Sequence, residues 1–378
     1  MLPKTNPDSA ACFVGRVWRP GLGPALVRLD GETLTDITSR ALPTMQALCE
    51  AADPAAAARA APGVPIGTLT DLGTDPEAGP VLLAPPDLQA IKAAGVTFAA
   101  SMVERVIEEQ AAGDPDRAEA IRARVVAIIG DSLSGIAPGS EKAAQVKTVL
   151  QAEGLWSQYL EVGIGPDAEV FTKCPPMASV GAGAEIGLLP GSRWNNPEPE
   201  LVLAVGSTGR IVGATLGNDV NLRDIEGRSA LLLPKAKDNN ASSAIGPFLR
   251  LFDDGYGLDD VRRAELSMRV EGEDGFVLDG SSSMSEISRD PADIVAQTIG
   301  RHHQYPDGFF LYLGTMFAPV KDRDGPGQGF THHPGDVVTI TEPSLGSLTN
   351  VVRLSTEAPE WTFGTAALMR NLAGRGLL

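Results

Sequence analysis

The sequence has few of the residues on which several common chemistries depend. Its 378 residues include three cysteines and four histidines, and aromatic residues make up only 5%. Cys12, Cys49 and Cys174 are far apart and lack Cys-x-x-Cys spacing, so neither a disulfide framework nor a zinc site is expected. Sparse, scattered cysteines favour reduced thiols, and we expect a cytoplasmic protein.

Basic residues are also scarce, and no long hydrophobic run is present. The net charge is −17, which argues against nucleic acid and anionic membrane surfaces as partners. The N-terminal residues 1–7 contain no apolar segment of the signal-peptide kind, and no run approaches the ~18 apolar residues of a membrane span. A small anionic substrate is compatible with this charge where a bound cation or local Lys and Arg residues reverse the field.

The chain does have enough apolar residues for a core, and the pattern of apolar and polar residues changes along its length. Hydrophobic residues make up 43%, too many for a disordered chain. We predict a small N-terminal β-rich domain over 1–88 and a main domain over 89–378. Helical periodicity over 99–128 and 140–153 gives way to short strands with many glycines and prolines. This pattern predicts an α+β, mostly β fold whose strands pair over long distances.

Three acidic residues form the most informative pattern of the sequence. Glu198 and Glu200 precede an apolar, β-prone run, and side chains two apart on a strand share one face. Asp219 ends the next strand-like run. Buried carboxylates this close repel each other, and a hard divalent cation with oxygen ligands relieves that repulsion. The alternative is a solvated edge strand, which the proline between the two glutamates would favour.

Three other motifs are weaker candidates. Ser132 stands in Gly-Asp-Ser-Leu after a strand-like run, but no Asp-x-x-His supplies the base that a serine esterase needs. Residues 181–187 resemble a dinucleotide loop but have one residue too many and lead to a strand rather than a helix. The adjacent histidines at 302–303 and 332–333 have no other ligand cluster nearby, so we predict solvated loop histidines.

From Gly95 onward, about three quarters of the chain resembles the fumarylacetoacetate hydrolase family. Each motif is weak alone, but the motifs occur in the family's order. They are Gly95–Glu104, Glu169–Pro176 with Glu198–Glu200, Gly217–Asp224 with Pro234–Asp238 and Ile245–Phe248, and Leu313–Met316 with Pro334–Val338 and Leu345–Asn350.

The resemblance implies a fold of rolled, mixed β-sheets, a divalent-metal site and a homodimer or homotetramer. The metal is usually Mg²⁺, with Mn²⁺ or Ca²⁺ as alternatives, and its ligands map onto the same Glu198, Glu200 and Asp219. The active-site lysine of the family maps onto Lys237. The backbone groups that hold the substrate carboxylate map onto Gly314 and Thr315.

One departure from the family's pattern bears on the reaction. Hydrolytic members carry His-x-x-Glu on the lid segment, where this chain has Ser101 and Glu104. Serine is a poor general base at neutral pH. The resemblance therefore implies a Mg²⁺-dependent dehydratase (a hydro-lyase) of a 2-keto-3-deoxypentonate, most similar to the D-xylonate type. It would form 2-ketoglutarate semialdehyde through an enolate at C3 and loss of the C4 hydroxyl. The alternatives are C–C bond hydrolysis of acylpyruvates or 2,4-diketo-3-deoxy sugar acids, and a non-enzymatic binder of small acids.

Four side chains are assigned roles within this reaction. Lys237, with its pKa lowered by a nearby cation, is the candidate base at C3, and Glu104 the candidate acid at C4, although these roles can be exchanged. Ser101 either bonds the substrate or a water, or caps a helix. Lys173 either faces the anionic 2-oxo acid or is a solvated strand residue.

Overall fold

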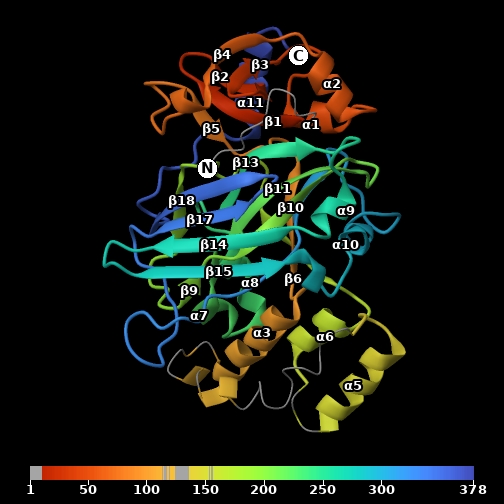
Figure 1. Cartoon of the computed structure of the whole chain (residues 1–378), viewed down its shortest axis with the longest axis vertical. Coiled ribbons are helices and arrows are strands. Elements are labelled where there is room, and N and C mark those ends of the chain that lie inside the picture. Colours follow the sequence, from red (N-terminus) through yellow and green to blue (C-terminus); the bar gives the residue numbers. More distant parts are fainter. Residues whose placement is uncertain are drawn as a thin grey trace.

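The chain forms a stack of three parts: a cap of strands and short helices, a pair of packed sheets in the middle, and a group of helices at the far end (Figure 1). The computed structural model describes residues 11–112, 114, 117–118, 120–123, 136–152, 154 and 156–378. The Gly-Asp-Ser-Leu serine, Ser132, lies outside these residues, so its predicted turn stays untested.

The largest sheet has 11 strands and runs from the cap through the middle of the molecule. In the order in which they pair, its strands are β4 (Val64–Thr68), β3 (Thr33–Asp36), β2 (Gly23–Asp30), β1 (Phe13–Arg19), β13 (Ser243–Leu251), β11 (Ile211–Asp219), β10 (Pro199–Val205), β16 (Phe309–Tyr312), β6 (Ala90–Gly95) and β7 (Glu169–Cys174). The eleventh strand, β5 (Val81–Leu83), pairs with β1.

A second sheet packs against the first. Its five strands, in order of pairing, are β15 (Val277–Ser283), β14 (Glu265–Glu271), β17 (Val337–Glu342), β18 (Gly346–Leu354) and β8 (Glu185–Leu188). A short ladder joins β9 (Asn195–Asn196) and β12 (Asn221–Leu222) beside the ends of β10 and β11. Parallel and antiparallel pairs occur in both large sheets, so the predicted mostly β, mixed fold is confirmed.

Helices cover the ends of the sheets. The α-helices are α1 (Met45–Cys49), α2 (Pro54–Ala60), α3 (Ala99–Ala111), α5 (Glu141–Ala152), α6 (Gln158–Ile164), α7 (Arg223–Glu226), α8 (Leu233–Lys237), α9 (Leu258–Val261), α10 (Pro291–Thr298) and α11 (Thr365–Gly374). Short 3₁₀ turns lie at Leu69–Asp71, Ala230–Leu232 and Met284–Glu286. Within the described part of the chain, no helix combines the length and apolar character of a membrane span.

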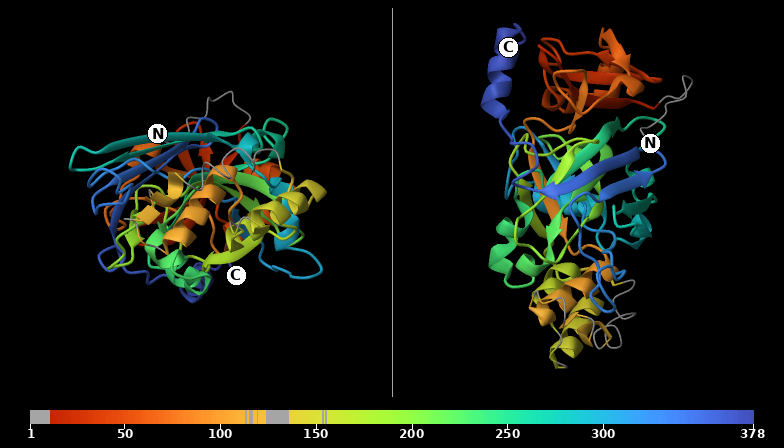
Figure 2. Two further views of the ribbon diagram at one scale, coloured as in Figure 1. Left: turned by 90° about the horizontal axis from the view of Figure 1, so that it is seen from below. Right: turned by 90° about the vertical axis from the view of Figure 1, so that its left-hand side faces the viewer.

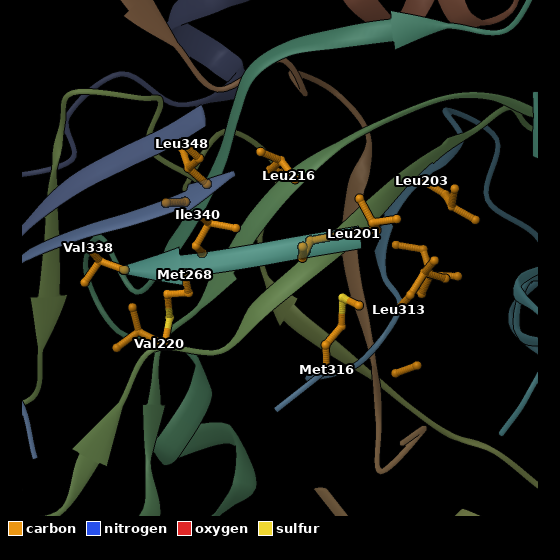
Figure 3. Close-up of a cluster of buried hydrophobic side chains, with 14 of the residues drawn as sticks. Leu201, Leu203, Leu216, Val220, Met268, Leu313, Met316, Val338, Ile340 and Leu348 are labelled. Carbon is orange, nitrogen blue, oxygen red and sulfur yellow. The ribbon is translucent and has the colours of Figure 1, made fainter. Parts of the chain in front are cut away.

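The side chains of β10 alternate between two hydrophobic clusters. Leu201 and Leu203 belong to the cluster that joins the two sheets, together with residues such as Met268 and Ile340 of the second sheet (Figure 3). Val202 and Ala204 point into a different cluster. Every residue of β10 is buried, and the strand lies between β11 and β16. The edge-strand alternative for the glutamate motif is therefore wrong.

The C-terminal helix α11 stands beside the cap rather than on the sheets, as the right-hand view of Figure 2 shows. The side-chain amide of Asn371 donates to the Leu22 carbonyl at 2.8 Å, and Arg375 donates to the Pro24 carbonyl at 2.7 Å. The two ends of the described chain thus meet in one part of the molecule. Strand β1 also pairs with β13, and a domain boundary at residue 88 stays a prediction.

The prediction of solvated histidines is wrong at His332. This side chain is fully buried, and its Nδ1 lies 2.9 Å from Oδ2 of Asp336. Arg323 binds the same carboxylate at 2.6 and 2.7 Å. In the sequence, Arg323 and Asp336 are simply two residues thirteen apart on a long loop. That separation gives no periodic signal from which their ion pair could be predicted. His302 and His303 are exposed, as predicted.

Candidate active site

The predicted three carboxylates converge at one end of the central strands. Glu198, Glu200 and Asp219 are all buried, and each has an oxygen within 4.8 Å of the others. Glu198 and Glu200 continue the face of β10 that carries Val202, because side chains alternate along a strand. The Asp219 amide donates to the Glu198 carbonyl at 3.1 Å, which holds the end of β11 against the start of β10.

Two buried lysines neutralise part of this charge. Nζ of Lys237 lies 2.5 Å from Oε2 of Glu198 and 3.1 Å from Oδ2 of Asp219. Nζ of Lys173 lies 2.7 Å from the other oxygen of Asp219 and bonds the Lys237 carbonyl. Lys173 is fully buried behind Asp219 and is absent from the residues that line the pocket. Its predicted substrate contact therefore gains no support, whereas Lys237 does line the pocket.

The charges of the site perturb its titration. Burial, and then repulsion from Asp219 and Glu198, raises the pKa of Glu200 well above its usual range. Burial also disfavours the charged form of Asp219, but Lys173 and Lys237 outweigh this and lower its pKa. For Lys237, burial is likewise outweighed by Asp219 and Glu198, so its pKa is raised. The lowered pKa predicted for Lys237 beside a bound cation stays a prediction, because the raised pKa belongs to the metal-free site.

The predicted anion-binding residues bond one of the three carboxylates. The Gly314 amide donates to Oε2 of Glu200 at 2.7 Å, and the Thr315 hydroxyl donates to Oε1 of the same residue at 3.3 Å. Gly314 has a φ of +99°, and a Cβ there would lie 2.0 Å from the Thr97 hydroxyl, so only glycine fits. These groups orient Glu200, and Thr315 also lines the pocket. A contact of either with a substrate stays a prediction.

Helix α3, which corresponds to the predicted lid segment, brings an arginine to the site. Arg105 is buried, and its guanidinium bonds Oε1 of Glu198 and lies 2.7 Å from Oε2 of Glu226 on α7. Glu104, one residue earlier, bonds Arg122 instead and is not among the pocket residues. The geometry gives no support to Glu104 as the acid at C4. Ser101 lies on α3, but its side chain is outside what the structure describes.

Glu169, at the start of β7, is a site residue that the sequence reasoning missed. Its carboxylate lines the pocket and has no hydrogen-bond or ion-pair partner among the described residues. Burial and repulsion from Glu226 outweigh the attraction of Arg105 and Lys237, which raises the pKa of Glu169 to about 7. Its partner in the ladder is Gly95, and a Cβ at that position would lie 1.9 Å from Oε2 of Glu169. The sequence offered no signal for this residue, because the pairing that places it joins distant strands.

The pocket composition fits a divalent cation. Its lining residues are Ala94, Gly95, Val96, Arg105, Glu169, Phe171, Glu198, Glu200, Asp219, Glu226, Lys237 and Thr315. Five carboxylates thus face two cationic side chains, an excess of three formal negative charges that buried Lys173 reduces to two. Carboxylate oxygens are the donors that Mg²⁺ and Ca²⁺ take. A bound divalent cation would balance the remaining charge and relieve the repulsion that perturbs Glu200.

A mixed β fold around three convergent carboxylates defines the class to which this protein belongs. The family model described as fumarylacetoacetate (FAA) hydrolase C-terminal matches residues 142–353, more than half of the chain. The chain belongs to this family, and the resemblance seen in its motifs is confirmed.

Individual relatives carry more specific names. The chain is 34% identical over 194 residues to a probable 2-keto-3-deoxyxylonate dehydratase of Haloferax volcanii, and 31% identical over 188 residues to a 2-dehydro-3-deoxy-D-arabinonate dehydratase of Saccharolobus solfataricus. The matches cover 51% and 49% of this chain but only 63% and 58% of the relatives' own lengths.

A solved structure shares the fold. It is a 2-keto-3-deoxy-D-arabinonate dehydratase complexed with magnesium and 2,5-dioxopentanoate, 20% identical to this chain, with a TM-score of 0.61 over 90% of this chain and 99% of that one.

Proposed function

We propose that this protein is a Mg²⁺-dependent hydro-lyase that converts a 2-keto-3-deoxypentonate into 2-ketoglutarate semialdehyde and water. The observation that carries the proposal is one pocket in which three convergent carboxylates adjoin Lys237 and Glu169, whose carboxylate has no partner in the part of the chain that the structure describes. The names of the relatives, which are pentonate dehydratases, supply the reaction class. Assembly as a homodimer or homotetramer stays a prediction.

The two sugar names among the relatives describe one substrate when the xylonate belongs to the D series. Oxidation at C2 and loss of the hydroxyl at C3 remove two stereocentres, which leaves C4 alone. C4 has the same configuration in D-xylonate and D-arabinonate, so both acids give the same 2-keto-3-deoxy compound. We therefore propose the D form at C4, which includes the D-xylonate-derived substrate.

The reaction combines a dehydration with an isomerisation. A proton leaves C3 and the C4 hydroxyl leaves as water, giving a C3–C4 double bond. A proton then leaves C5 and another returns to C3, which gives an enol that becomes the aldehyde at C5. Glu198, Glu200 and Asp219 would hold the cation. When bound, it would polarise the 2-oxo group and acidify the hydrogens on C3.

We assign the proton transfers to Lys237 and Glu169, which line the same pocket. General acid–base catalysis needs groups within hydrogen-bond reach of the reacting atoms. Glu169 meets this condition better than the predicted Glu104, whose carboxylate is bonded to Arg122. A carboxyl group that titrates near neutral pH exchanges protons efficiently in either direction.

Hydrolysis of a C–C bond is less well supported by this pocket. Hydrolytic members of the family activate water with a histidine on the lid segment, a role that histidine fills readily near neutral pH. The residues that line the pocket in the described part of the chain include no histidine.

The product distinguishes these reactions. The purified protein is incubated with Mg²⁺ and D-2-keto-3-deoxypentonate, and the products are separated by mass and by chemical trapping of aldehydes. We expect the semialdehyde with one water lost per substrate. No turnover of this substrate, together with hydrolysis of a 2,4-dioxo acid to pyruvate and a second carboxylic acid, would contradict the proposal.

A further inference from the structure

The ion pair between Arg105 and Glu226 is a part of the pocket to which the family motifs assign no role. Arg105 comes from α3 and Glu226 from α7, so two helices far apart in the sequence meet at one wall of the pocket. Their side chains are 10% and 6% exposed, and the guanidinium lies 2.7 Å from the carboxylate. A buried pair of this kind costs much desolvation and contributes little net stability, so its place in the pocket invites a functional reading.

The arrangement of charges orients a substrate relative to this pair. If the carboxylate and 2-oxo group of the substrate bind at the three carboxylate ligands, the rest of the carbon chain must extend away from them. Thr315 and Gly314 lie on the Glu200 side of the site, where both bond Glu200. Arg105 lies on the Glu198 side. On the Glu198 side, the hydroxyl-bearing end of the substrate would meet Lys237, Arg105 and its partner Glu226.

The chemistry of the pair suits a hydroxyl group. A guanidinium donates several hydrogen bonds in a fixed plane, and a carboxylate only accepts them. A hydroxyl both donates and accepts, so it can insert between the two and bond each. The terminal C5 hydroxyl is the group that the product retains as its aldehyde oxygen, and a proton must leave the carbon that carries it.

We propose that Arg105 and Glu226 form the subsite that recognises the C5 hydroxyl of the substrate. This inference rests on the proposed function for the orientation of the carbon chain. It assigns to α3 a role in specificity, since this helix supplies Arg105 to the subsite.

The test compares two inert ligands that differ by one hydroxyl. Neither 2-oxopentanoate nor 5-hydroxy-2-oxopentanoate has a leaving group at C4, so calorimetry on the Mn²⁺-loaded protein measures binding alone. We expect the wild type to prefer the hydroxylated ligand by about tenfold, the scale of one hydrogen bond to a charged group. In Arg105→Met at saturating Mn²⁺ this preference should vanish, while affinity for 2-oxopentanoate changes by less than about threefold, below the effect of one such bond.

Two further variants distinguish recognition of the hydroxyl by Arg105 from an effect of net charge and from a structural role. Arg117→Met removes an exposed arginine that follows the lid helix and should keep the wild-type preference. Glu226→Gln retains an acceptor but breaks the ion pair, and should lower the preference without abolishing it. Equal affinities in the wild type, or a preference that survives in Arg105→Met, would overturn the subsite. Loss of both ligands and of Mn²⁺ together would instead make Arg105 a support for Glu198, and would also overturn it.

The outcome is independent of turnover. A wild type that prefers the hydroxylated ligand but dehydrates no 2-keto-3-deoxypentonate would refute the proposed reaction and leave the subsite standing.

Discussion

At the scale of single residues, the chemistry of the site depends on which carboxylates have a lysine or arginine partner. Asp219 is paired with Lys173 and Lys237, and Glu198 with Lys237 and Arg105. Glu169 has no such partner among the described residues, although it lies in the same pocket. An uncompensated acid in such a pocket is a poor contributor to stability, and its raised pKa suits it to proton transfer.

Replacing Glu169 by glutamine should abolish most of the activity and spare the metal site. We expect kcat to fall by ~10²–10⁴, the contribution of a general acid–base group, while Mn²⁺ affinity measured by calorimetry stays unchanged. Exposed Glu357→Gln is the control for loss of one acid. A fall of less than about tenfold, outside that range, would move the proton transfer to another residue.

The same residue should leave a signature in the pH dependence of stability. The pKa of Glu169 is raised from its usual value of 4.5 to about 7, so between these values the native state holds a proton that the unfolded state has released. The free energy of unfolding must then decrease as pH rises through this window. Because glutamine does not titrate, the metal-free Glu169→Gln variant should become more stable relative to the wild type as the pH rises from 5 to 7. Urea unfolding of both proteins at each pH measures this difference. Parallel curves for the two proteins would show that Glu169 titrates normally.

Lys173 provides a test of the buried charges behind the metal ligands. Lys173→Met leaves Asp219 without its closest cation, and breaking a buried ion pair from one side costs about 3–5 kcal/mol. Urea unfolding should show a loss of this size in the absence of metal. Added Mg²⁺ should recover part of it, because the cation would replace the missing charge. A loss below about 1 kcal/mol, typical of an exposed pair, would mean that Lys173 contributes little to holding Asp219.

At the scale of secondary-structure elements, the pairing of β6 with β7 positions Glu169. Gly95 stands opposite it in the ladder, and a Cβ there would collide with its carboxylate. Gly95→Ala should therefore displace Glu169 and lower kcat toward the level of Glu169→Gln, with Mn²⁺ affinity retained. Gly374→Ala on α11 is the control, because a Cβ there meets nothing within 4 Å. Wild-type activity in Gly95→Ala would show that Glu169 has room to move without loss of function.

The elements also show how far the sequence alone leads. The period of two along β10 was enough to predict that Glu198 and Glu200 share a face, and the end of the next apolar run identified Asp219. Proline at position 199 suggested an edge, but it is the first residue of a central strand, where a proline costs the ladder little. The role of Glu169 depends on a pairing of strands 74 residues apart, between Gly95 and Glu169. No local pattern encodes such a pairing.

The lysine and arginine partners of the three carboxylates were harder to predict than the carboxylates themselves. Lys173 looked equally suited to solvent and to a substrate because strand periodicity gives a face but not what covers it. Arg105 stood among several charged residues of α3, and its neighbour Glu104 was chosen on the family motif. The fold brings Arg105 rather than Glu104 to the pocket, because its guanidinium reaches α7 and β10.

At the scale of the whole molecule, the site lies where the central sheets meet the helical end, away from the cap (Figure 1). The cap and α11 bind each other through Asn371 and Arg375. Binding of a cation should therefore stabilise the sheets and the helices α3, α7 and α8 directly, and the cap only through the shared sheet. Any ligand that binds the native state alone raises its stability in proportion to the logarithm of its concentration.

The most direct measurement is a calorimetric titration of Mn²⁺ into the metal-free wild type and into Asp219→Asn. If three carboxylates converge on a cation, we expect one ion per wild-type chain. The affinity of the variant should be lower by more than ~100-fold, a greater loss than the replacement of a residue that only supports a ligand causes. Equal binding by the two proteins, or no binding by a correctly folded wild type, would contradict the account at its centre.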